Sequence, residues 1–187
     1  MPFQATNIYG FEGLMVIEPK VFGDERGFFM ETYSYNDFEK IGIKTIFIQD
    51  NHSRSGKNIL RGLHFQNPPH MQAKLVRCIR GEIMDVAVDI RKDSHSYGKW
   101  CSQILSETNR KMFYVPEGFA HGFLTLSEIA EVCYKVDKLY SPESEGGIIW
   151  NDPDLDITWP AQSPTLSDKD KRWPRLKDLD PPFIYKK

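Results

Sequence analysis

Three features that the sequence lacks exclude several classes of protein. The sequence has only three cysteines, Cys78, Cys101 and Cys133, and no Cys-x-x-Cys pair, so neither a disulfide framework nor a zinc finger is expected. It has no apolar run long enough to cross a bilayer. Its formal net charge is −2, so no overall positive field attracts nucleic acid or a membrane surface. An anionic ligand must therefore be bound by a local group of Arg and Lys.

The cysteines and the N-terminus indicate a compartment. Each cysteine lies in an apolar, strand-like run, which favours small buried hydrophobic side chains in a reducing environment over a catalytic thiol. Residues 1–7 lack the basic segment and the apolar segment of a secretory signal. We therefore expect a cytoplasmic protein that has no nucleic-acid or membrane partner.

What the chain does contain is typical of a sheet protein. Hydrophobic residues make up 40% and aromatic residues 13% of the 187 residues, and aromatic rings pack well on pleated surfaces. This length fits one domain over residues 1–187, with its core at about 8–178. Short strand-like runs follow one another at regular intervals, which predicts an all-β sandwich or barrel. The predicted strands cover residues 13–19, 27–33, 45–51, 74–80, 82–90, 100–105, 112–115, 122–126 and 131–137.

Two segments depart from this pattern. Residues 34–42 (SYNDFEKIG) predict a short helix that begins at Ser34 and ends at Gly42. From residue 140 onward the prolines exclude a long regular element, although residues 167–179 are compatible with one or two helical turns. Because this tail carries tryptophans that need a surface to pack on, residues 140–187 are expected to wrap over the sheet.

Two histidines are the first candidates for chemistry. His64 lies near the end of the strand-like run LRGLHFQ, and His121 lies in PEGFAHG, a Pro-x-Gly-x-x-His pattern that resembles the second metal motif of cupin jelly rolls. Metal-binding cupins also need an earlier His-x-His, where this chain reads His64-Phe65-Gln66. Two imidazoles without a matched carboxylate make a poor metal site. We therefore expect a jelly roll that works without a metal and without another cofactor.

Other candidates have strong structural alternatives. Lys74, Arg61 and Arg26 are possible partners for an anion, but most such side chains are solvated. Tyr134 has the strand parity of Val132 and Val136, so its ring is expected on the apolar face, where a core tyrosine is the ordinary interpretation. Asp170 follows Ser167 by three residues, a spacing that favours a helix-capping pair.

The motifs taken together resemble the deoxysugar-nucleotide 3,5-epimerases, the dTDP-4-dehydrorhamnose 3,5-epimerase family. The resemblance runs from about residue 8 to about residue 178. It is specific because many blocks occur in one order. The blocks are residues 24–31 (DERGFFME), 49–53 (QDNHS), 60–66 (LRGLHFQ), 74–81 (KLVRCIRG), 116–123 (PEGFAHGF), 134–135 (YK), 140–145 (YSPESE) and 166–170 (LSDKD).

The resemblance implies a role for each matching residue. It makes His64 the general base, Asp170 the carboxylate that orients it, Tyr134 the general acid and Lys74 the cation beside the sugar ketone. The positions implied to bind the nucleotide sugar are Arg26, Glu31, Gln49, Asn51, Arg61, His121, Tyr140, Glu145 and Lys169. It further implies a dTDP-sugar substrate, epimerised at C3 and C5 beside a C4 ketone, a cupin-type jelly roll, and a homodimer that exchanges N-terminal strands.

Some questions stay open at this point. In a regular strand Arg61 and His64 face opposite sides, so either Gly62 marks a bulge or the two residues reach different active sites. The same scaffold also suits a 3- or 5-mono-epimerase. A metal-dependent cupin and a non-enzymatic sugar-binding jelly roll are the more distant alternatives.

Overall fold

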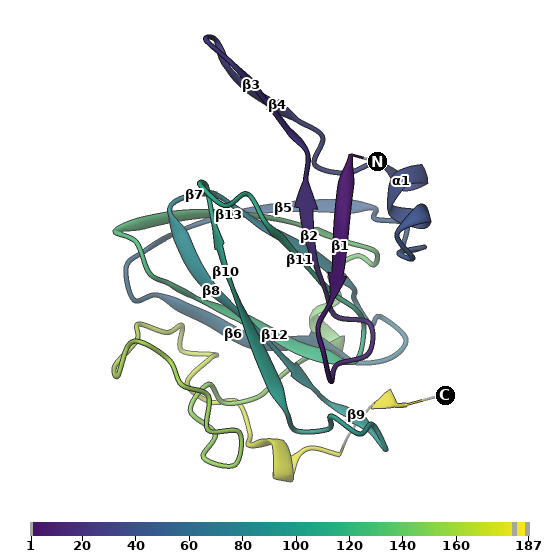
Figure 1. Ribbon diagram of the computed structural model, residues 1–187. Helices are drawn as coiled ribbons and strands as arrows, with labels where there is room; N and C mark the ends of the chain where they lie inside the picture. The colour runs from purple at the N-terminus through teal and green to yellow at the C-terminus, as the bar shows by residue number, and fades with distance from the viewer. Residues whose placement is uncertain (1, 181–182, 186–187) are drawn as a thin grey trace.

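The computed structural model describes residues 2–180 and 183–185, and it confirms the all-β fold class (Figure 1). Two antiparallel sheets face each other, as in a jelly roll. The six-stranded sheet has the order β1 (Phe3–Asn7), β2 (Met15–Pro19), β11 (Met112–Val115), β7 (Lys74–Arg80), β13 (Ile129–Val136) and β5 (Gln49–Gly56). The five-stranded sheet has the order β10 (Trp100–Ser106), β8 (Glu82–Asp89), β12 (Phe119–Thr125), β6 (Leu60–Gln66) and β14 (Glu145–Gly147).

Small elements complete the described chain. They are the hairpin β3 (Val21–Asp24)–β4 (Gly27–Met30), the pair β9 (Arg91–Lys92)–β15 (Phe183–Ile184), the helix α1 (Tyr35–Lys40) and the 3-10 turns η1 (Pro142–Ser144) and η2 (Leu176–Asp178). The predicted helix thus exists, and η2 lies in the segment predicted to hold helical turns. The predicted strand at 45–51 instead begins at Gln49 and runs on to Gly56.

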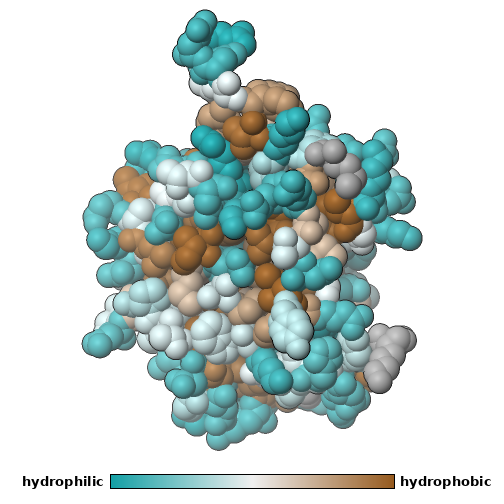
Figure 2. Space-filling view, in the orientation of Figure 1, coloured by the Kyte–Doolittle hydropathy of each residue, from teal (hydrophilic) through white to brown (hydrophobic). Residues whose placement is uncertain are grey.

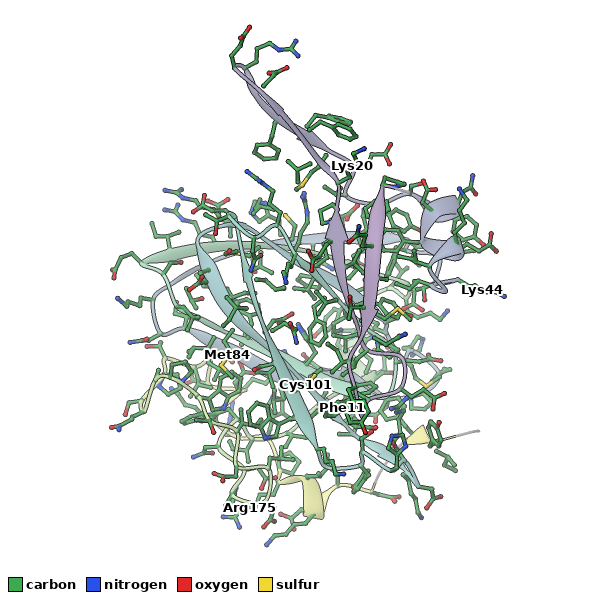
Figure 3. All side chains as sticks on the ribbon, in the orientation of Figure 1. Phe11, Lys20, Lys44, Met84, Cys101 and Arg175 are labelled. Atoms are coloured by element: carbon green, nitrogen blue, oxygen red, sulfur yellow. The ribbon has the colours of Figure 1, made fainter. Side chains whose placement is uncertain are left out.

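The five-stranded sheet is buried on both faces. Val76, Ala87 and Phe123 belong to the core between the two sheets. On the opposite face Met84 and Val86 pack with Ile148, Leu155 and Leu176 of the C-terminal segment. Figure 1 shows this segment, coloured green to yellow, beneath β6, β8 and β12, and Figure 3 labels Met84 on that side. Ile148, Leu155 and Leu176 therefore cover the outer face of the sheet that carries both candidate histidines.

The turn at Gly81 joins two strands that do not pair with each other. β7 pairs with β11 and β13, whereas β8 pairs with β10 and β12, so the chain crosses between sheets at this glycine. Gly81 has φ +72°, and a Cβ built there would lie 2.1 Å from the Ile129 carbonyl oxygen. Only glycine fits this corner. The crossing places β7 and β8 on opposite walls of the interior.

The β3–β4 hairpin projects from the body of the molecule (Figure 1). Phe22, Phe28 and Phe29 on it are 51%, 58% and 66% exposed. Figure 2 shows hydrophilic residues at the hairpin tip and hydrophobic ones nearer the body. Among the described residues, no helix is both long and apolar enough to cross a membrane.

Candidate active site

A cavity of about 770 Å³ opens between the two sheets. Both sheets and the C-terminal segment contribute to its wall. Ten of the residues singled out from the sequence line it: Asn51, Arg61, His64, Lys74, His121, Tyr134, Tyr140, Glu145, Lys169 and Asp170. The sequence motifs, which lie as far apart as residues 51 and 170, therefore converge on one hollow.

His64 forms a short hydrogen bond with Asp170. His64 projects from β6, and its Nε2 lies 2.6 Å from Oδ1 of Asp170 in the C-terminal segment. Burial of Asp170 opposes its ionisation, but the hydrogen bonds from His64 and Trp173 outweigh this and hold its pKa below the ordinary value. An ionised carboxylate only accepts hydrogen bonds, so Nε2 of His64 carries the proton. The neutral imidazole then presents a bare Nδ1, which is the form a general base needs.

The two interpretations of Asp170, as part of a helix cap and as the carboxylate that orients His64, are compatible. Its backbone N–H donates to Oγ of Ser167 at 3.1 Å, as the capping pattern predicts. The carboxylate also contacts His64 and Trp173. Asp170 is only 3% exposed, so the turn around Ser167 fixes a buried acid beside the imidazole.

Tyr134 lies on the six-stranded sheet, and its ring is on the apolar face that its strand parity predicts. It projects from β13 between Asn51 of β5 and Val76 of β7, its partners in the strand register, and it packs against the core between the sheets. Burial raises the pKa of its phenol, and the positive charge of Arg61 works against that rise. At neutral pH the hydroxyl is therefore protonated and able to give a proton.

Lys74 places a cation on the wall of the cavity. It shares the interior face of β7 with Val76 and Cys78, and its Nζ donates to Oε1 of Gln72 at 3.1 Å. Burial lowers the pKa of Lys74 to about 8, although the charge of Asp137 opposes the shift. The ammonium form still predominates at pH 7. A cation held in a partly dry site stabilises a developing oxyanion more than water does.

A bulge brings Arg61 and His64 to the same side. His121 of β12 is paired with His64, but Phe123, two residues on, is paired with Arg61, three residues back. β6 therefore has one extra residue in this stretch, and the parity conflict disappears. Gly62 lies within it with φ +140°, and a Cβ there would be 2.5 Å from Cα of Gly122. Of the two explanations left open by the sequence, the bulge is correct.

A buried acid beside His121 was missed by the sequence analysis. Nε2 of His121 lies 2.7 Å from Oδ1 of Asp85 on β8, and the Asp85 side chain is fully buried. The available signal was an acid in the middle of the apolar strand 82–90. The regular alternation suggested an ordinary strand, but the side of β8 that carries Asp85 faces the interior, and Met84 and Val86 face the C-terminal segment.

The mouth of the cavity holds a polar cluster. Tyr140 is 54% exposed, and its hydroxyl donates to Oε2 of Glu145 at 3.1 Å. Lys169 donates from Nζ to Oε1 of the same Glu145 at 2.5 Å. An exposed aromatic ring beside paired charges suits a flat, polar ligand at the rim.

Three predicted binding residues do not line this cavity. Arg26 lies at the tip of the β3–β4 hairpin, paired with Asp24, and its side chain is 84% exposed. Glu31 directly follows β4 and is exposed. Gln49 begins β5 and donates from Nε2 to Oδ1 of Asn51 at 2.8 Å, so it reaches the cavity wall only through Asn51.

The arrangement suits proton transfer. The cavity combines an imidazole with a bare nitrogen, a phenol on the opposite sheet and an internal ammonium, which are the groups needed to remove and return a proton beside a carbonyl. Across residues 2–180 and 183–185, no group of three or more His, Cys, Asp or Glu side chains is placed to hold a metal ion. Fold and site together define an enzyme of the epimerase class built on a jelly roll.

Comparison with known proteins identifies the family. A family model described as dTDP-4-dehydrorhamnose 3,5-epimerase matches residues 9–178. A dTDP-4-dehydrorhamnose 3,5-epimerase from Salmonella typhimurium is 57% identical over 165 residues, which are 87% of this chain and 90% of that protein. A dTDP-4-dehydrorhamnose 3-epimerase from Streptomyces niveus is 40% identical over 163 residues, 87% of this chain and 79% of its own length.

A solved structure agrees with this assignment. The dTDP-6-deoxy-D-glucose-3,5-epimerase of Legionella pneumophila, in complex with dTDP-4-keto-L-rhamnose, superposes with a TM-score of 0.94 at 44% identity, covering 99% of this chain and 100% of that one. The chain belongs to the dTDP-4-dehydrorhamnose 3,5-epimerase family. The resemblance inferred from the sequence motifs is thereby confirmed.

Proposed function

We propose that this enzyme epimerises dTDP-4-dehydro-6-deoxy-D-glucose at C3 and C5, giving dTDP-4-dehydro-L-rhamnose for deoxysugar synthesis in the cytoplasm. One observation carries the proposal: the His64–Asp170 pair and Tyr134 come from opposite sheets and line the same cavity. Inversion at a carbon requires a proton to leave from one side and return from the other. A base and an acid on facing walls meet that requirement.

Each step follows from the protonation states described above. Nδ1 of His64 removes the proton from the carbon next to the ketone, and the electron pair of the C–H bond moves to the C4 oxygen. Lys74 stabilises the enolate oxygen. Tyr134 then gives its proton to the opposite side of the same carbon, and the C4 carbonyl re-forms. Transfer of one proton from His64 to Tyr134 through solvent restores the enzyme for the second carbon.

The nucleotide is assigned to the rim of the cavity. Arg61 and Lys169 supply positive charge for the diphosphate, which the overall net charge of −2 does not provide. Tyr140 supplies an exposed ring on which the base stacks, and its bond to Glu145 orients it. Asn51, held by Gln49, offers an amide to the sugar.

The remaining predicted residues fit a homodimer. The hairpin that bears Arg26 extends away from the body of the molecule (Figure 1) and exposes three phenylalanines. We infer that it packs on a second copy and delivers Arg26 and Glu31 to that copy's site. Covering Phe22, Phe28 and Phe29 supplies the apolar burial that such an exchange needs.

The test is incubation with dTDP-4-dehydro-6-deoxyglucose in D₂O, followed by NMR. Double epimerisation places deuterium at both C3 and C5, whereas a mono-epimerase, such as the 3-epimerase relative, labels one carbon. The proposal of double epimerisation would be overturned if C3, C5 or both took up no deuterium. His64→Ala is expected to lower the rate by on the order of 10²–10⁴-fold, because the base is removed. His95→Ala, at an exposed position outside the site, is the matched control and is expected to retain full activity.

A further inference from the structure

Two His–Asp pairs of nearly equal geometry lie at the cavity wall, and Asp85 is buried behind His121. Nε2 of His64 lies 2.6 Å from Asp170, and Nε2 of His121 lies 2.7 Å from Asp85. The two histidines are direct partners in the β6–β12 register, and both line the cavity. In each pair the carboxylate occupies Nε2, so Nδ1 is the nitrogen left to meet a ligand.

The surroundings of the two acids differ sharply. Asp170 accepts a second hydrogen bond, from Trp173, and lies in a turn of the C-terminal segment. Oδ2 of Asp85 has no hydrogen-bond partner among the residues that the structure describes. A buried carboxylate oxygen without a donor is costly when it carries charge, and much less so when the acid is protonated.

The other groups that face Asp85 do not supply the missing donor. Cys78 of β7 and Cys101 of β10 are the remaining titratable neighbours, and both belong to the apolar core between the sheets. Burial raises the pKa of these thiols to about 11 and about 12, so neither brings a charge near Asp85. Burial likewise raises the pKa of Asp85, although His121 opposes the rise, whereas the pKa of Asp170 is lowered.

The number of protons in each pair decides what Nδ1 does. A pair with one proton holds it between Nε2 and the carboxylate, and Nδ1 is bare. A pair with two protons has a hydrogen on Nδ1 when the neutral acid donates its own proton to Nε2, and also when the imidazole is charged. The first arrangement accepts a proton, and the second donates a hydrogen bond.

We propose that Asp85 is a positioning residue that keeps a proton on Nδ1 of His121, so that His121 donates a hydrogen bond to the C4 oxygen of the sugar while His64 accepts a proton from carbon. As the C–H bond breaks, its electron pair moves to that oxygen, and the bond from His121 strengthens beside Lys74. The proton of His121 is not transferred. The inference rests on the proposed epimerisation, because it assigns a role within that reaction.

The same substitution at the two acids separates the roles. In Asp85→Asn the amide donates to Nε2 and so leaves the hydrogen on Nδ1, as a protonated acid does, and activity is expected to stay within about tenfold of the wild type. In Asp170→Asn the same donation forces the hydrogen onto Nδ1 of His64 and removes the base. A loss on the order of 10⁴-fold is expected there, as when a His–Asp pair holds the wrong tautomer.

Two further variants complete the series. His121→Phe removes the donor and is expected to lower kcat by on the order of 10²–10³-fold, with a smaller change in KM. Asp85→Leu removes the partner of Nε2, and its activity is expected to lie between the activities of Asp85→Asn and His121→Phe. Activity of Asp85→Asn as low as that of Asp170→Asn would overturn the proposal, because Asp85 would then be needed in its ionised form.

A spectroscopic readout remains informative even if a variant folds poorly. NMR of the ¹⁵N-histidine-labelled wild-type protein at pH 7 is expected to show a protonated Nδ1 for His121 and a bare Nδ1 for His64. A bare Nδ1 on His121 would overturn the inference. The wild-type D₂O experiment tests the reaction separately. If it shows no exchange at C3 or C5, the proposed function fails. If exchange is normal but the histidine states are the same, only this inference fails.

Discussion

At the scale of single residues, the activity of the site depends on the protonation states of Asp170 and Lys74. Asp170 is kept ionised by donors at short range, and Lys74 is kept only weakly basic by burial. These two environments place one base and one cation around the same reacting centre at neutral pH. A shift in either pKa changes the rate before it changes the shape of the cavity.

The lowered pKa of Lys74 predicts that activity declines at alkaline pH. Because burial lowers its pKa to about 8, the ammonium is lost as the pH rises above that value, and kcat/KM is expected to fall. Lys74→Arg keeps its charge in this range and is expected to move the alkaline limb upward, whatever its effect on the maximum rate. The pH profiles of the two proteins check this. An alkaline limb that does not move would show that another group sets it.

The charge of Lys74 has opposite effects on stability and on activity, because its burial opposes folding while it supports catalysis. Its folded-state pKa is below the unfolded value near 10.4, so its charge opposes folding at pH 7, and stability rises as the pH increases between about 8 and 10.4. Lys74→Met is therefore expected to unfold at a higher urea concentration at pH 7. Its kcat is expected to drop by on the order of 10²–10³-fold. Lower stability of Lys74→Met at pH 7 would contradict the burial argument.

At the scale of elements, the alternation of side chains made β7, β8 and β13 predictable. It gave the parity of Tyr134 correctly. It did not show that β7 and β8 belong to different sheets, because a tight turn at Gly81 is equally consistent with a hairpin. The strand predicted at 45–51 ended before the observed β5, Gln49–Gly56, because polar residues occupy the second half of β5, at the edge of the sheet.

The bulge in β6 gives an element-scale prediction. Gly62→Ala adds a Cβ 2.5 Å from Gly122 at φ +140°, where an L-residue is strained, and about 2–4 kcal/mol of stability is expected to be lost. Activity is expected to fall as well, because Arg61 and His64 flank this position. Urea unfolding measures the first effect. Gly56→Ala on β5, where the nearest atoms are 3.9 Å from the new Cβ and φ is not positive, is the control and is expected to stay within about 0.5 kcal/mol.

At the scale of the whole molecule, a single copy of the chain does not bring all the predicted residues together. Ten of the residues that the sequence motifs indicated line the cavity, because each lies on a strand or turn of the same chain that the topology folds inward. Arg26 and Glu31 could not be placed from the sequence, since their motif ends on a hairpin that leaves the body. A strand pattern predicts which face a residue takes, but not which copy of the chain it meets.

The proposed exchange of hairpins is tested by mixing two inactive proteins. Arg26→Ala and His64→Ala homodimers each lack one component of both sites. In a mixed dimer made by co-expression, one site receives an intact His64 and an intact Arg26. Random assembly gives about one quarter of wild-type activity, from half of the dimers with one working site each. No recovery in dimers of the expected mass would show that Arg26 serves its own chain.

Asp170 is separated from His64 by 106 positions and arrives with the C-terminal segment. During synthesis, both sheets are therefore complete before the partner of the imidazole leaves the ribosome. Until that last stretch settles on the five-stranded sheet, the cavity holds a histidine of undefined tautomer. The capacity to remove a proton from carbon is therefore expected to appear only late in maturation, after the C-terminal segment has packed.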